Sequence, residues 1–130
     1  MSLLDEIVAW DDESVVTRAV IRESSPFVEE GRVPALLLLE YMAQSIAAYA
    51  GAQAQQRGEP VKLGYLISCR QMALEIDSLA IGDEVEVQAR RRWGEALLGN
   101  FECVALRGEE RIAQAQLSVY QGQLEETDRA

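Results

Sequence analysis

The chain has 130 residues, which fits one domain, and hydrophobic residues make up 48% of it, as in ordinary soluble globular proteins. Its net charge of −10 argues against nucleic acid and against anionic membrane surfaces, because both require a basic face. The chain contains no histidine, which removes the commonest zinc ligand and the commonest general base.

The cysteines and the N-terminus predict the compartment. Cys69 and Cys103 are neither numerous enough for a disulfide framework nor close enough for a metal-ligand pair. Residues 1–10 carry Asp5 and Glu6 and no basic segment, so we expect no signal peptide. These features predict a cytoplasmic protein in a reducing environment, with no metal site.

Two short strands are predicted first along the chain. Leu3–Trp10 and Val15–Ile21 are rich in apolar and β-branched residues, and the polar Asp11–Ser14 forms a turn between them. A loop with a proline and a closing glycine follows over Glu23–Gly31. The start of the chain therefore predicts a hairpin and then a connection to a different element.

A long helix is predicted next, from about Val33 to Arg57. Pro34 would lie in its first turn, where the missing N–H is tolerated, and Gly58 would end it as a left-handed cap. Apolar residues cover most of the helix circumference, which predicts burial nearly all round. They are Leu36, Leu37, Leu38, Leu39, Met42, Ala43, Ile46, Ala47 and Ala50.

Glu40 and Gln44 form a narrow polar strip on this helix, since residues four apart share a face. The apolar run 34–54 is long enough to raise the question of a membrane span. A carboxylate at mid-bilayer costs about 2.5–3.5 kcal/mol. We therefore expect a buried helix of a soluble protein and no membrane partner.

The rest of the chain reads as strands. Gly64–Ile76 is rich in apolar, β-branched and aromatic residues, and Gly82-Asp83 and Gly108 mark turns. The residues expected to face the core alternate with polar neighbours. They are Val85, Val87, Ala89, Phe101, Cys103, Ala105, Ala113, Ala115, Leu117 and Val119. Short turns make consecutive strands antiparallel, which predicts an α+β fold: one helix against an antiparallel sheet.

The predicted domain covers residues 1–122, and the polar segment 123–130 is expected to be a flexible C-terminal tail. A helix too apolar to be covered by one sheet face also suggests a partner subunit. The pattern alone thus predicts a single domain that works as an oligomer.

Two segments resemble a known family. Gly31-Arg32-Val33-Pro34-Ala35-Leu36 followed by Glu40-Tyr41-Met42-Ala43-Gln44 is similar to the helix entry of the FabZ/FabA-like 3-hydroxyacyl-[acyl-carrier-protein] dehydratases, and Ile81-Gly82-Asp83-Glu84-Val85 is similar to a later turn. The compressed loop before the helix looks more like the divergent branch from aryl-polyene-type polyketide clusters. The resemblance extends over about residues 3–121.

The resemblance implies a hot-dog fold, in which an antiparallel sheet wraps a long central helix. It implies dimers, and substrates bound as thioesters to the phosphopantetheine of acyl carrier protein or to CoA, with no further cofactor. It also implies that Glu40 is the catalytic acid. A carboxylate among leucines is expected to be withdrawn from water, which favours its protonated form.

This chain departs from the family at the catalytic histidine, which the family carries in the loop before the helix. Here that loop, residues 24–31, reads Ser-Ser-Pro-Phe-Val-Glu-Glu-Gly. A partner subunit could supply the missing histidine. Ser25, Glu29 or Glu30 could instead act as base, although adjacent acids before a glycine are more often a solvated turn.

Further residues are candidates for binding the substrate. Gln44 could orient Glu40 or bond across a dimer, or make only a structural hydrogen bond. The N–H groups of Gly31, Arg32 and Val33 could hold the thioester carbonyl, although every helix start offers free donors. Phe27, Tyr41 and Tyr65 could line an acyl channel, although core packing is the commoner role of such residues.

Arg90-Arg91-Arg92 is the basic cluster of the sequence. It suits an acidic carrier protein or the phosphate of a pantetheine arm, although a solvated strand end is the commoner explanation of such a cluster. Three functions remain open at this point. They are a dehydratase-like subunit that needs a histidine-bearing partner, a hot-dog acyl thioesterase that uses Glu40, and a non-catalytic acyl-binding subunit.

Overall fold

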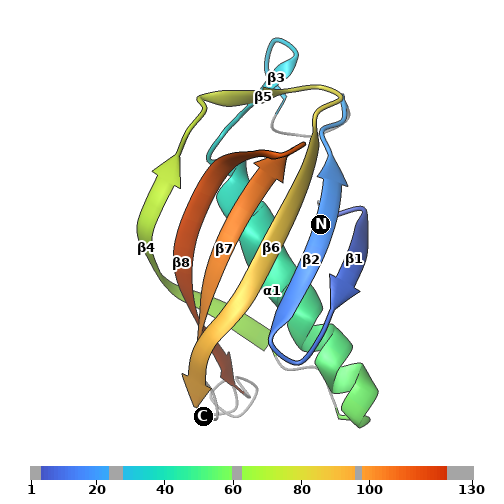
Figure 1. Cartoon of the computed structure of the whole chain (residues 1–130), viewed down its shortest axis with the longest axis vertical. Coiled ribbons are helices and arrows are strands. Elements are labelled where there is room, and N and C mark those ends of the chain that lie inside the picture. Colours follow the sequence, from blue (N-terminus) through green and yellow to red (C-terminus); the bar gives the residue numbers. More distant parts are fainter. Residues whose placement is uncertain (1–3, 24–27, 60–62, 96–97, 123–130) are drawn as a thin grey trace, which may run out of the picture.

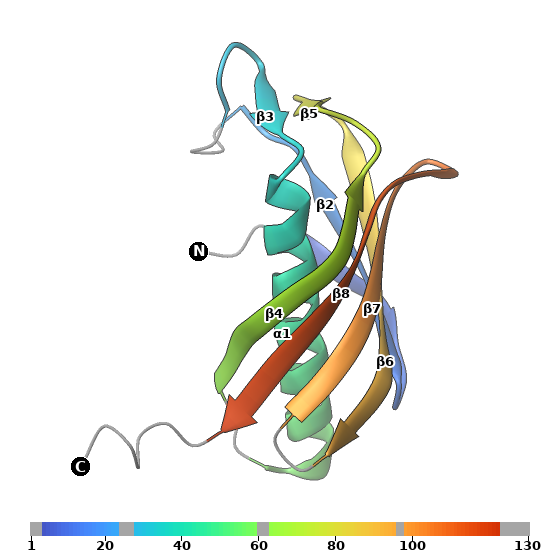
Figure 2. The same ribbon diagram turned by 90° about the vertical axis from the view of Figure 1, so that its left-hand side faces the viewer.

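The computed structural model describes residues 4–23, 28–59, 63–95 and 98–122. In these residues a long helix lies against a six-stranded antiparallel sheet of order β1-β2-β6-β7-β8-β4, and β3 and β5 form a separate two-stranded sheet (Figure 1). The sheet curves around one side of α1, and no strand of the described residues covers the other side (Figure 2). The predicted α+β hot-dog fold is confirmed.

The elements follow the predicted order. Their bounds are β1 Glu6–Trp10, β2 Ser14–Val20, β3 Arg32–Pro34, α1 Leu37–Arg57, β4 Leu63–Leu74, β5 Ser78–Ala80, β6 Glu84–Glu95, β7 Leu98–Arg107 and β8 Glu110–Gly122. Long β6, β7 and β8 pair in sequence order through short turns, as predicted for the C-terminal half. The small sheet of β3 and β5 was not predicted.

The turn between β1 and β2 forms as the sequence predicts. The Asp11 carboxylate accepts hydrogen bonds from the N–H groups of Glu13 and Ser14, both at 2.8 Å. This is the local side-chain bonding that makes aspartate a turn residue. β1 is an edge strand whose five residues are all exposed, including Val8 at 52%.

The predicted start of the helix is wrong. α1 begins at Leu37, and Val33 and Pro34 lie in β3, where they pair with Leu79 and Ser78 of β5. Glu30 and Gly31 precede them with φ of 54° and 78°, which forms a tight reversal. Proline suits this edge strand as well as a first helical turn, so it could not decide between the two.

The predicted end of the helix is confirmed at Gly58. This residue has φ 67° in the left-handed region, and its N–H donates to the carbonyl of Gln55 at 3.2 Å. The next N–H, of Glu59, donates to the carbonyl of Ala54 at 2.9 Å. Together these bonds satisfy carbonyl groups of the last turn that have no partner within the helix.

The core lies between α1 and the concave face of the sheet. Every residue expected to face inward from β6, β7 and β8 is buried. On α1 the buried residues form one face, and they are Leu37, Leu38, Tyr41, Met42, Ser45, Ile46, Tyr49 and Gln53. A buried hydrogen bond of 2.7 Å between the hydroxyls of Thr17 and Ser45 fixes the helix against β2.

Burial of the helix nearly all round is not observed within one chain. Leu36 is 60% exposed, and Glu40 and Ala47 are exposed as well. A sheet covers only one side of a helix, so the opposite side stays open unless a second layer covers it. None of the helices in the described residues is long and apolar enough to cross a membrane.

Candidate functional site

The site begins with Glu40 and Gln44 in the first two turns of α1, on the side that faces away from the sheet. The Gln44 side-chain amide donates to a Glu40 carboxylate oxygen at 3.2 Å, as the spacing of four residues predicts. Glu40 is exposed, so its expected withdrawal from water is not met within a single chain. The carboxylate is instead presented on the uncovered side of the helix.

A groove of about 530 Å³ lies between the N-terminal strand and α1. Its size falls within the range of small-molecule sites, about 300–1,000 Å³. Alanines on the helix leave room that longer side chains would fill. Gln44 lies in its wall and connects the groove to Glu40. The lining residues are Leu4, Asp5, Glu6, Ile7, Gln44, Ala47 and Ala48.

The groove was missed at the sequence level, although a signal was present. Ala43, Ala47 and Ala50 recur at helical spacing on the side where Glu40 lies, and their small size, as well as their apolar character, is the signal. Small residues on one helix face allow either a close approach of another backbone or an open groove. The path of β1 in the folded chain leaves the space at Ala47 open as a groove.

An ion pair holds the chain beside this groove. Asp5 meets the Arg22 guanidinium at 2.5 Å and accepts a 2.6 Å hydrogen bond from the N–H of Val20. Partial burial would raise the pKa of Asp5, but the bonds from Arg22 and Val20 outweigh it, and the pKa lies below its usual 3.8. The Asp5 carboxylate is therefore ionised at neutral pH and serves as an anchor, not as an acid.

Tyr41 follows Glu40 in the sequence but points into the core. Burial, together with the negative charge of Asp5, raises the pKa of Tyr41 to about 12. Its hydroxyl therefore keeps its proton throughout the physiological range. Neither Tyr41 nor Asp5 is suited to remove a proton from carbon.

The residues expected to bind the thioester carbonyl do not lie at the helix start. The N–H of Arg32 donates to the carbonyl of Glu29 at 3.1 Å, and its guanidinium donates to the Ser78 hydroxyl at 2.6 Å. Val33 is buried in β3, and Gly31 occupies the tight turn. The helix begins four residues later than expected, so these N–H groups do not form its first turn. Their role in binding the thioester carbonyl stays a prediction.

Of the three aromatic candidates, Tyr41 is a core residue, and the side chains of the other two are untested. Phe27 lies outside the described residues. Tyr65 lies in β4, paired with Tyr120 of β8, and its side chain is likewise outside the description. β4 and β1 occupy opposite edges of the six-stranded sheet. The strand that carries Tyr65 therefore does not border the groove between β1 and α1.

Cys103 lies outside the candidate site. Cys103 is buried, and burial raises its pKa to about 12, so it is an inert core thiol. No cluster of His, Cys, Asp and Glu suited to a metal ion occurs in the part of the chain that the structure describes.

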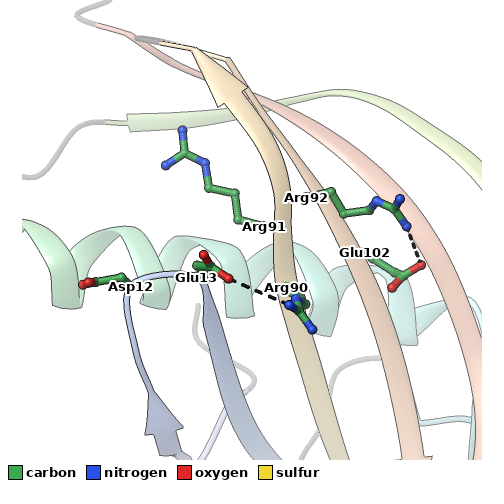
Figure 3. A pocket seen from close by; sticks show the side chains of 6 residues that line it. All are labelled: Asp12, Glu13, Arg90, Arg91, Arg92 and Glu102. Atoms are coloured by element: carbon green, nitrogen blue, oxygen red, sulfur yellow. Dashed lines mark hydrogen bonds and ion pairs between the residues drawn. The ribbon is translucent and has the colours of Figure 1, made fainter.

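A second polar hollow, of about 530 Å³, lies where β6 ends beside the β1–β2 turn (Figure 3). Arg90 lies 3.9 Å from Glu13, and Arg92 lies 3.2 Å from Glu102. Arg91 approaches the hydroxyl of Tyr49, which donates to the carbonyl of Asp12. The predicted basic cluster thus exists in space, with carboxylates around it.

Comparison with protein families gives one match over residues 1–129, to the family described as "ApeP-like: ApeP dehydratase". No curated protein matches the chain at the sequence level.

Solved structures share the fold. A chain of "The Dehydratase Heterocomplex ApeI:P from Xenorhabdus doucetiae" matches with a TM-score of 0.92 at 22% identity, over 98% of this chain and 88% of that one. A hypothetical thioesterase from Streptococcus pneumoniae, solved with coenzyme A, matches with a TM-score of 0.69 at 10% identity, over 89% and 86%. The PaaI protein of E. coli, from a phenylacetic acid degradation operon, matches with a TM-score of 0.70 at 11% identity, over 91% and 79%.

Proposed function

This chain belongs to the ApeP-like dehydratase family, and from that premise we propose that it is one subunit of a heteromeric dehydratase that removes water from 3-hydroxyacyl thioesters. The observation that carries the proposal is an exposed Glu40–Gln44 pair in a chain that has no histidine. The expected resemblance to aryl-polyene-type dehydratases agrees with this family.

The reaction needs an acid and a base. A base removes the proton from the carbon next to the thioester carbonyl, the C–O bond at the 3-position breaks, and an acid protonates the departing hydroxyl so that it leaves as water. We assign the acid to Glu40. Gln44 is a positioning residue, because its amide holds one oxygen of that carboxylate.

The base must come from elsewhere. Glu29 and Glu30 lie in an exposed tight turn, where Glu29 and Arg32 exchange two backbone hydrogen bonds. That geometry supports a solvated turn and not a base aimed at a substrate. A histidine of a second hot-dog subunit is the simplest source, since the side of α1 that carries Glu40 is uncovered in one chain.

Two features of this chain support a partner. β4 is a 12-residue edge strand that pairs with β8 on one side, and a long edge of this kind invites another sheet. The similar Xenorhabdus doucetiae structure is itself a heterocomplex by its description. Coverage of the Glu40 side by a second subunit would also supply the withdrawal from water that a single chain lacks.

The acyl chain would occupy the groove between β1 and α1, with the thioester near Glu40 and Gln44. The carrier is acyl carrier protein or CoA, both of which present the acyl group on a pantetheine thiol. A hot-dog thioesterase that uses Glu40 toward water is the alternative, because it needs no histidine. Release of free thiol, as opposed to loss of water, distinguishes the two reactions.

The test replaces Glu40 with Gln in the complex formed with a histidine-bearing hot-dog subunit. Glutamine keeps the shape and the bond to Gln44 but cannot donate the proton. We expect dehydration of a 3-hydroxyacyl thioester, followed as loss of water by mass spectrometry, to fall by about 10²–10⁴-fold. The matched control is Glu59→Gln, the same change at an exposed position just beyond the other end of α1.

An E40Q complex that dehydrates as fast as the E59Q complex would remove Glu40 from the mechanism. Release of thiol without loss of water, abolished by E40Q, would establish the thioesterase instead.

A further inference from the structure

Three consecutive arginines at the end of β6 take no part in the dehydration chemistry described above. Arg90, Arg91 and Arg92 are all exposed, in a chain whose net charge is −10. Arg91 lies beside Tyr49, which is nine residues after Glu40 in α1 and thus about 14 Å further along the helix axis. The arginine cluster is therefore separate from Glu40 but lies beside the same helix.

The carboxylates around the arginines hold them loosely. The Arg90–Glu13 pair is 3.9 Å long with both side chains 71% exposed, and the Arg92–Glu102 pair is about half exposed. Exposed pairs of this kind contribute little and are screened by salt. An incoming acidic surface can take over these guanidinium groups at small cost.

The shape of the cluster favours a broad partner over a small anion. Arg91 and Arg92 extend to opposite sides of β6, and Arg90 points away from both (Figure 3). A phosphate group is best bound where several guanidinium groups converge on one point. Spread cations match a surface on which several carboxylates are also spread.

Resting on the proposed function, we propose that Arg90 and Arg92 form the docking surface for the acidic carrier protein that delivers the thioester. The acidic remainder of this chain repels such a carrier, so the arginines decide where it binds and in which orientation. The pantetheine arm of a carrier docked here must extend at least about 14 Å along α1 to reach Glu40.

The test compares one active complex on three substrates that carry the same acyl group, on carrier protein, on CoA and on pantetheine without phosphate. We expect Arg90→Glu/Arg92→Glu to lower kcat/KM by about tenfold or more for the carrier-bound substrate and to leave the pantetheine and CoA substrates unchanged. Raised ionic strength should weaken the wild-type preference for the carrier in the same way. Arg111→Glu, an exposed arginine on β8, is the matched control.

Titration of the full chain with carrier protein measures docking without turnover, so it decides the proposal even if the complex does not dehydrate. Weaker binding of the double variant, with the control unchanged, supports docking at the arginines. Unchanged binding and unchanged carrier kinetics would overturn the proposal. An equal loss with the CoA substrate would assign the arginines to a phosphate instead, and an equal loss with pantetheine would assign them a structural role; either result rejects carrier docking.

Discussion

The reactivity proposed for the Glu40 carboxylate depends on its neighbours and not on its own burial. Within one chain the carboxylate is exposed and is held at one oxygen by Gln44. The spacing of four residues predicted this contact, because such residues share a helix face. The exposure of Glu40 could not be predicted, because neighbours in the sequence need not surround a side chain in the fold. Leu37 and Leu38 are buried against the sheet, whereas Leu36 is 60% exposed.

Ala47 provides a test of the groove at the scale of one side chain. Ala47→Met should fill part of the space between β1 and α1. We expect kcat/KM for long acyl chains to fall about 10- to 100-fold, because each displaced methylene forfeits about 0.8 kcal/mol. Short acyl chains should react at the wild-type rate, as measured by a chain-length series with the heteromeric complex.

Ala54→Met is the matched control, since Ala54 lies two turns further along the same helix and is not part of the groove lining. Equal losses for short and long chains would point to a disturbed subunit contact. Undiminished activity on long chains would place the acyl group somewhere other than the groove.

At the scale of elements, the sequence predicts well the features that depend on local periodicity. The strands β6, β7 and β8 bury the alternate residues that their pattern marks, and Gly58 ends the helix as expected. The start of α1 depends instead on a contact between Val33 and Leu79, 46 residues apart. No local pattern contains that pairing, so Pro34 was equally compatible with a helix and with an edge strand.

Gly51 inside α1 and Gly58 at its C-terminal cap are expected to change stability in opposite directions when replaced by alanine. Gly58→Ala forces a residue with a Cβ atom into the left-handed region, and we expect it to lower the free energy of unfolding by about 1 kcal/mol. Gly51→Ala lies inside the helix with nothing within 4 Å of the added Cβ, and we expect it to raise the same quantity by up to about 1 kcal/mol. Urea unfolding of the isolated chain measures both.

The pair controls for itself, because each variant adds one methyl group to the same helix. A Gly58→Ala chain as stable as the wild type would show that the left-handed cap does not hold the end of α1. Destabilisation by Gly51→Ala would show that this face of the helix is more crowded than the structure indicates.

At the scale of the whole molecule, the chain belongs to a dehydratase family but carries no histidine. The resemblance recognised from the sequence agrees with the family match over residues 1–129, and the lack of histidine marks what is missing. The uncovered side of α1 and the long edge strand β4 show where a second subunit can join. The identity of that subunit is not encoded in this chain, because complementary surfaces can be read only from both partners.

We propose that an acid from this chain and a base from a partner complete one active site. The most direct measurement is the rate of dehydration of a carrier-bound 3-hydroxyacyl thioester by this chain alone, by a histidine-bearing hot-dog partner alone, and by the two mixed. We predict little turnover by either protein alone and a rate at least about 10²-fold higher for the mixture. Dehydration by this chain alone at the rate of the mixture would contradict the account.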